Sequence, residues 1–209
     1  TYSISNTTEK RIGLFKKLLA NGKIQNLGIR ASLHQQNYTS VTELFISPFV
    51  IENQGIIQDC RLLEFNYTSA LSNLITINFG GFCVNNSATI KNCISSADIT
   101  FDGNIQQQGI LRSNINVGGI VHANVTSTKA LIENCGNDGN ITVRALTISV
   151  GGIAVSHNLG KISGCYFKGS LDVFISQSGS NINRIGGLAA LSKQKIENSY
   201  TNCNITVDM

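Results

Sequence analysis

A repeat of about 34 residues runs through most of the sequence and restricts the folds open to it. Four glycine pairs, each followed by Phe, Ile or Leu, begin at positions 80, 118, 151 and 186, with spacings of 38, 33 and 35 residues. A tetrad similar to Ile-x-Asn-Cys follows each pair: Ile90-Lys91-Asn92-Cys93, Ile132-Glu133-Asn134-Cys135, Ile162-Ser163-Gly164-Cys165 and Ile196-Glu197-Asn198-Ser199. Looser copies begin at Ile24 and Ile57. A unit this short cannot bury its apolar face alone, so successive units must stack.

The residues within each unit indicate strands. An aliphatic residue follows the leading Ile by nine positions in five of the six copies, at Leu33, Ile99, Ile141, Leu171 and Ile205, whereas the second copy has Asn66 there. In the last four copies this residue starts an apolar-polar-apolar alternation, which is typical of a strand with one buried face. A helical repeat is excluded by the abundance of Ile, Val, Thr and Gly and by the period of two. We therefore expect an all-β chain that forms a right-handed parallel β-helix, a solenoid of about six coils.

The chain reads as a single β-helix domain, 1–209, and as a fragment of a longer protein. The repeats fall near 23–46, 47–79, 80–117, 118–150, 151–185 and 186–209. Insertions at 68–78, 102–116 and 176–183 are expected to be loops. In segment 1–22, Asn6 and Glu9 resemble a capping box and precede an apolar stripe, which predicts a short N-terminal capping helix. Because Gly13 interrupts this stripe, the alternative is the first half of a coil.

Charge excludes some functions. Charged residues make up only 13% of the chain and the net charge is +4. The one basic concentration, Lys10, Arg11, Lys16 and Lys17, is too small for the basic stripe of a nucleic-acid-binding protein. As part of an amphipathic helix it would touch an anionic membrane surface, but a solvated face is the favoured interpretation. No apolar run reaches the roughly 20 residues of a membrane span, so membrane insertion is not expected.

Segments 13–29 and 151–171 resemble the GLUG-motif repeats. They share a Gly-Gly-aliphatic start or its Gly-Leu-Phe variant, an Asn-x-Gly-x-Ile or Gly-Lys-Ile turn, an Asn-Leu or Gly-Cys step, and a glycine before the closing strand. The resemblance extends over roughly 13–207. It implies a non-catalytic solenoid region of the kind found in bacterial surface adhesins and in large secreted zinc metallopeptidases that cleave immunoglobulin A. It also implies an extracellular or cell-surface location.

The cysteines are the first candidates for chemistry. Four of the six share the last position of the tetrad and two lie elsewhere: Cys60, Cys93, Cys135 and Cys165, then Cys83 and Cys203. No Cys-x-x-Cys pair is present, so no metal site is predicted. Strand spacing would permit a disulfide between neighbouring coils, but in-register side chains point the same way. A buried column of thiols is therefore the favoured interpretation, with a disulfide as the alternative.

Acids and histidines form no recognisable catalytic pattern. Glu133 and Glu197 share an outward column but are separated by Ser163, so the carboxylates are two coils apart, and both are expected on a solvated surface. His34, His122 and His157 occupy different positions of the repeat and are expected to be surface or turn residues. We predict no catalytic residue, no cofactor and no metal.

Seven Asn-x-Ser/Thr sequons occur, at Asn6, Asn37, Asn66, Asn85, Asn124, Asn140 and Asn204. If the source glycosylates secreted chains, Asn37, Asn66 and Asn124 are expected in loops or turns that would accept a glycan. Asn140 and Asn204 precede equivalent strands and are expected to serve as turn residues.

Three functions remain open. The first is a structural spacer or adhesive solenoid, with surface glycans or other proteins bound through its loops. The second is a carbohydrate-binding or polysaccharide-degrading β-helix, for which Tyr38, Tyr67, Tyr166 and Tyr200 would line a groove with acids. The third is the non-catalytic arm of a large secreted protease. End-to-end self-association is a further expectation, since a final strand at 205–207 without a cap would expose a coil edge.

Overall fold

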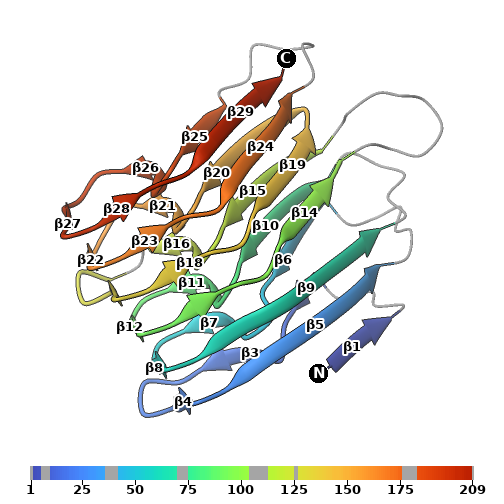
Figure 1. Ribbon diagram of the computed structural model, residues 1–209. Helices are drawn as coiled ribbons and strands as arrows, with labels where there is room; N and C mark the ends of the chain where they lie inside the picture. Colours follow the sequence, from blue (N-terminus) through green and yellow to red (C-terminus); the bar gives the residue numbers. More distant parts are fainter. Residues whose placement is uncertain are drawn as a thin grey trace.

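The computed structural model describes residues 2–5, 10–35, 42–69, 75–103, 113–124, 127–175 and 183–208. The described residues form parallel strands and no helix. The strands form five parallel sheets that run along one axis. The chain passes from sheet to sheet within a rung and then starts the next rung, which stacks on the one before (Figure 1). The parallel β-solenoid predicted by the repeat is confirmed.

We call the five sheets A to E and give their strands in chain order. Sheet A contains β1 (Tyr2–Ser5), β5 (Gly28–Gln35), β9 (Arg61–Ser69), β13 (Ile94–Ser95), β18 (Gly136–Asn137), β23 (Tyr166–Phe167) and β28 (Tyr200–Thr201). Sheet B contains β2 (Arg11–Ile12), β6 (Glu43–Ile46), β10 (Thr76–Gly80), β15 (Asn114–Gly118), β20 (Thr147–Gly151) and β25 (Arg184–Gly186). Sheet C contains β3 (Phe15–Leu18), β7 (Val50–Asn53), β11 (Cys83–Asn86), β16 (Val121–Asn124), β21 (Ala154–His157) and β26 (Ala189–Ser192).

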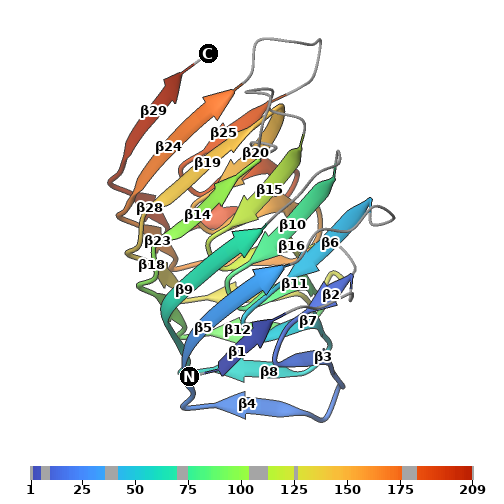
Figure 2. The same ribbon diagram turned by 90° about the vertical axis from the view of Figure 1, so that its right-hand side faces the viewer.

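Sheet D follows sheet C in each of six rungs, and sheet E follows sheet A in the last four. Sheet D contains β4 (Lys23–Gln25), β8 (Ile56–Gln58), β12 (Thr89–Lys91), β17 (Leu131–Glu133), β22 (Lys161–Ser163) and β27 (Ile196–Glu197). Sheet E contains β14 (Ile99–Asp102), β19 (Ile141–Ala145), β24 (Ser170–Ile175) and β29 (Asn204–Asp208). Figure 2 shows the same strands from the side, with β4 in the first complete rung and β29 in the last.

The leading isoleucines of the six repeats lie in one file. Each pairs in register with the next through sheet D: Ile24, Ile57, Ile90, Ile132, Ile162 and Ile196. Four of them, Ile57, Ile90, Ile132 and Ile162, are fully buried. Burying one such side chain contributes about 1.5–3 kcal/mol, and every rung supplies one. A second file runs through sheet E from Ile99 to Ile205.

A β-bulge accounts for the one irregular repeat. Ile29 pairs with Leu62, but Arg30 pairs with Glu64, so Leu63 is an extra residue in β9. Because the register shifts there, Leu33 lies beside Tyr67 rather than Asn66. The sequence spacing missed this position by the one residue that the bulge inserts.

The predicted capping helix is wrong. Residues 11–18 form β2 and β3, which extend sheets B and C and represent the alternative of a first half-coil. Gly13 explains the outcome, because a Cβ there would lie 2.7 Å from the Ser47 carbonyl oxygen. The close approach of two backbones belongs to stacked rungs and not to an exposed helix. Asn6 and Glu9, the predicted capping box, lie outside the described residues.

The insertions are only partly loops. β10 begins at Thr76 and β15 at Asn114, so the ends of the first two predicted insertions are strand residues. Their central parts, and most of 176–183, lie outside the described residues.

Candidate functional site

The buried polar residues of sheet C form a continuous ladder. Asn53, Asn86 and Asn124 are fully buried and lie in register. Asn53 donates to the side-chain oxygen of Asn86 at 2.8 Å, and Asn86 donates to that of Asn124 at 2.9 Å. Each buried amide therefore satisfies its neighbour, which avoids the cost of roughly 1–3 kcal/mol for an unpaired group. These asparagines serve the fold.

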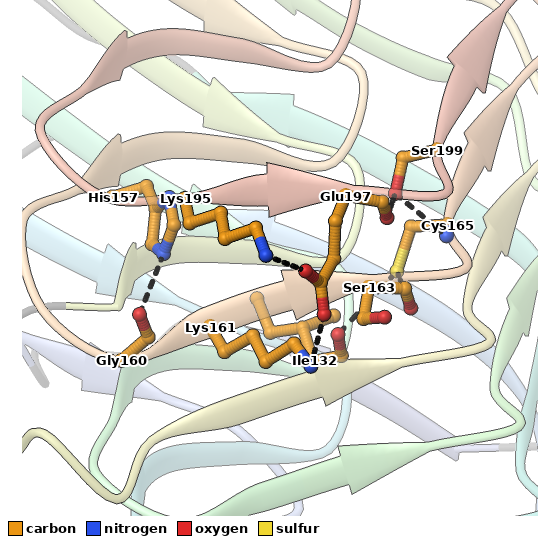
Figure 3. A network of polar contacts seen from close by, with 9 residues as sticks. All are labelled: Ile132, His157, Gly160, Lys161, Ser163, Cys165, Lys195, Glu197 and Ser199. Atoms are coloured by element: carbon orange, nitrogen blue, oxygen red, sulfur yellow. Dashed lines mark hydrogen bonds and ion pairs between the residues drawn. The ribbon is translucent and has the colours of Figure 1, made fainter.

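His157 takes the next position of this ladder (Figure 3). It is fully buried, with Nδ1 3.0 Å from Ser192 Oγ and Nε2 3.3 Å from the Gly160 carbonyl oxygen. Burial lowers the pKa of His157, and the Gly160 carbonyl partly opposes this effect. The expectation of a surface or turn residue is wrong for His157, because both ring nitrogens contact protein groups within the wall.

The other two histidines lie apart from it. His122 is half-buried on sheet C, and burial lowers the pKa of its imidazole to about 4. Its Nδ1 is buried without a hydrogen-bond partner among the described residues. His34 belongs to β5, and its side chain lies outside the described part of the structure. Among the described residues, no histidine side chain hydrogen-bonds to an acid. The Ser192 hydroxyl beside His157 donates to the Gln194 carbonyl oxygen at 3.0 Å, so this pair lacks the acid of a Ser-His-Asp arrangement.

The thiol column is present and buried. Cys60, Cys93, Cys135 and Cys165 are fully buried and follow one another from rung to rung, as the tetrad predicts. Each thiol donates to a carbonyl two residues earlier, for example Cys165 Sγ to Ser163 O at 3.4 Å (Figure 3). All six cysteines of the chain are free thiols in this structure. Burial raises the pKa of Cys135, which disfavours the reactive thiolate.

One of the two outward acids of sheet D, Glu197, is paired with lysines. Glu133, Ser163 and Glu197 follow one another in register, so Ser163 separates the two carboxylates as expected. Glu197 forms ion pairs with Lys161 and Lys195 (Figure 3). Hydrogen bonds from Lys161 and Lys195 lower the pKa of Glu197 to about 2. A carboxylate this acidic is ionised at neutral pH and cannot serve there as the proton donor of a glycosidase.

Two of the four candidate tyrosines come together. Tyr166 and Tyr200 lie in register on sheet A with their rings stacked, 5.7 Å between centroids. The Tyr166 hydroxyl donates to Asp138 at 3.2 Å, and the Lys168 ammonium lies 4.7 Å from the Tyr166 ring. Tyr67 instead packs on Phe101 at 5.0 Å. Tyr38 lies outside the described residues. The described tyrosines therefore form a cross-strand pair and not a groove.

A polar cavity that the sequence did not indicate lies on the outer face of sheet C. It has a volume of about 270 Å³ and is lined by Glu52, Gln54, Asn85 and Ser87. Glu52 accepts from Arg11 Nη1 at 2.8 Å and lies 3.7 Å from Lys17 Nζ. Sequence reasoning missed this group because its members belong to two repeats and resemble ordinary polar surface residues.

The sequons differ in exposure. Asn124 is fully buried in β16, so its predicted place in a loop is wrong. Asn66 is exposed but belongs to strand β9. Asn140 is an exposed turn residue, as expected, and its side chain accepts from the Ser170 backbone at 3.0 Å. Asn204 is the first residue of β29, and Asn85 is half-buried in β11. Asn6 and Asn37 lie outside the described residues.

Two of the four basic residues near the start, Arg11 and Lys17, lie on strands and beside the same acid. Arg11 and Lys17 both pair with Glu52, and no amphipathic helix carries them. Among the described residues, no helix has the length and apolar character that spanning a membrane requires. Nor do three or more His, Cys, Asp or Glu side chains converge on a metal position in the described ranges.

Comparison with protein-family models found no match to this chain, and comparisons with curated proteins and with solved structures found none either. The function is therefore inferred from the geometry of this chain and from its repeat pattern.

Proposed function

We propose that this chain is a non-catalytic structural or adhesive β-solenoid segment of a secreted or cell-surface protein. The supporting observation is that its buried Asn, Cys and His side chains form contacts that hold the rungs together. The asparagine ladder, the thiol column and His157 all direct polar atoms at neighbouring rungs; Cys165 Sγ, for example, lies 3.6 Å from the Ile132 carbonyl oxygen of the preceding rung. A scaffold that repeats its contacts in this way presents equivalent outward side chains at a fixed spacing of about 4.8 Å per rung.

The extracellular location is supported by the GLUG-like segments 13–29 and 151–171. The adhesive role is supported by outward side chains that the rungs hold in files, such as Tyr166 beside Tyr200. Polysaccharide degradation is the weaker alternative, since its best acid pair is interrupted by Ser163 and Glu197 is bound between two lysines. A non-catalytic arm of a large secreted protease would be the same kind of solenoid segment attached to a catalytic domain.

Deletion of one rung tests the scaffold. Removing residues 118–150 joins Val117 to Gly151, which replaces Gly118 at its own register position. If length and rigidity are what the chain contributes, the shortened protein folds and its maximum dimension in solution scattering falls by about 4.8 Å. An unfolded product, or an unchanged dimension, would contradict the proposal.

A further inference from the structure

The cavity on sheet C is built from matching positions of two neighbouring rungs. Glu52 in β7 and Asn85 in β11 pair in register. Gln54 and Ser87 follow two residues later along each segment and line the same cavity. Side chains two residues apart in an extended strand lie on the same face. The cavity wall is therefore a two-by-two arrangement of a carboxylate, two primary amides and a hydroxyl.

Buried residues between these positions fix the arrangement. Asn53 and Asn86 alternate with the four lining residues, point into the ladder and hydrogen-bond to each other at 2.8 Å. Asn53 Oδ1 also accepts from the Gly55 backbone at 3.0 Å, and Asn86 Oδ1 from the Ala88 backbone at 3.3 Å. These bonds hold both segments just past the strand ends, where a chain would otherwise be free to move. A site held in this way loses little entropy when a ligand binds.

The Glu52 carboxylate is oriented by two basic side chains, Arg11 and Lys17. Arg11 Nη1 contacts Glu52 Oε1, whereas Lys17 Nζ lies near Oε2 but at 3.7 Å, beyond hydrogen-bond distance. A carboxylate has about four acceptor positions, so capacity remains for a ligand. Because Arg11 and Lys17 already balance the charge of Glu52, a bound cation is not the ligand that this site favours.

The donors and acceptors match a sugar. Each amide and the hydroxyl both donate and accept, and the carboxylate accepts strongly, as adjacent hydroxyl groups of a pyranose require. The volume is just below the roughly 300–1,000 Å³ of drug-sized ligand sites, which suits a single sugar unit.

We propose that this cavity binds one neutral hexopyranose unit of a glycan, with Glu52 and Asn85 contacting its hydroxyls. The proposal rests on the adhesive half of the proposed function and gives that half a ligand class. An anionic sugar is disfavoured because the described residues that line the cavity include a carboxylate and no cation to receive an acidic group.

The test is an NMR titration of ¹⁵N-labelled protein made in bacteria that do not glycosylate Asn85. The probes are the methyl glycosides of glucose, galactose, mannose and N-acetylglucosamine, with glucuronate as the acidic comparison. We expect at least one neutral glycoside to shift the side-chain amide signals of Gln54 and Asn85 with a millimolar dissociation constant. Asn85→Ala should abolish this response, and Glu52→Gln should weaken binding about tenfold because a charge-assisted acceptor is lost.

Ser156→Ala is the matched control, since Ser156 lies in the same outward file two rungs beyond Asn85 and outside the cavity. It should bind like the unaltered protein, and thermal melting should confirm that all variants fold. The proposal is overturned if no neutral glycoside binds, if only glucuronate binds, or if Asn85→Ala responds normally. None of these results bears on the scaffold, which the rung deletion tests separately.

Discussion

At the scale of single residues, the corner between sheets D and A explains why Asn recurs in the tetrad. Asn26, Asp59, Asn92, Asn134 and Asn198 all have a positive φ, between 50° and 56°, and Gly164 at the same position has φ 63°. The left-handed backbone region accepts Gly readily and Asn or Asp more readily than other residues. The column is therefore defined by backbone conformation. The column of Asn residues is visible in the sequence. Its cause, the left-handed backbone, is indicated there only by Gly164, which replaces Asn at this position.

This explanation predicts opposite results for two changes at Asn134. Asn134→Val should lower the free energy of unfolding by about 1–2 kcal/mol, because a β-branched residue is strained at positive φ. Asn134→Gly should stay within roughly 0.5 kcal/mol of the unaltered protein, because glycine adopts this conformation freely. Urea unfolding measures both. Equal losses for Val and Gly would mean that the asparagine side chain, and not the backbone, determines the column.

His122 provides a pH-dependent prediction at the same scale. Its imidazole has a pKa of about 4 in the folded chain because burial penalises the charged form, against 6.5 ordinarily. Between these values the unfolded chain binds a proton that the folded chain does not, so stability falls as pH decreases from about 6.5 to about 4. His122→Val copies Val84 and Val155 at the same position of neighbouring rungs and should flatten this slope. Denaturation midpoints measured across this range in both proteins provide the test, and parallel slopes would refute it.

At the scale of elements, the glycine pairs mark the passage from sheet B to sheet C. A Cβ on Gly80, Gly118 or Gly151 would overlap the carbonyl oxygen three residues ahead, and one on Gly119 would overlap that of Gly152 in the next rung. The strands of the two sheets therefore approach too closely for any side chain. The sequence located these pairs correctly as repeat boundaries, but their spacing alone does not reveal which backbones meet there.

Gly118→Ala should consequently destabilise the chain by about 3–5 kcal/mol or prevent folding, because the obstructing atom is backbone and cannot rotate away. Gly28→Ala is the matched control: its Cβ would meet only the Leu63 side chain, with the nearest atom at 3.3 Å. That change should cost less than about 1 kcal/mol. Thermal unfolding of both variants checks the difference, and a mild effect at Gly118 would contradict the close approach.

The thiol column gives a second prediction at this scale. Five cysteines are fully buried and only Cys203 is partly exposed. Alkylation requires an accessible thiolate, so one thiol per chain should react quickly with iodoacetamide in buffer, and all six in denaturant. Mass spectrometry should place the fast adduct on Cys203. Rapid labelling of Cys93 or Cys135 would mean that the wall of the solenoid opens more easily than its packing implies.

For the whole molecule, the repeat was enough to predict the architecture, since one file of isoleucines and one alternating strand per unit admit few ways of burying apolar surface. Features that depend on contacts between rungs were not predicted from the repeat. The bulge at Leu63, the conversion of 11–18 into strands and the cavity around Glu52 and Asn85 each arise where two repeats meet. No single repeat contains the information for them.

The central claim is that equivalent residues lie one above another, one rung apart. Spin labels at Gln25→Cys and Glu197→Cys, which share a file five steps apart, test it directly in a Cys203→Ser background. Pulsed electron–electron double resonance should give about 24 Å for this pair and about 19 Å when Gln58→Cys replaces Gln25→Cys, a difference of one rung. Separations that do not shorten by one rung would contradict the stacked solenoid.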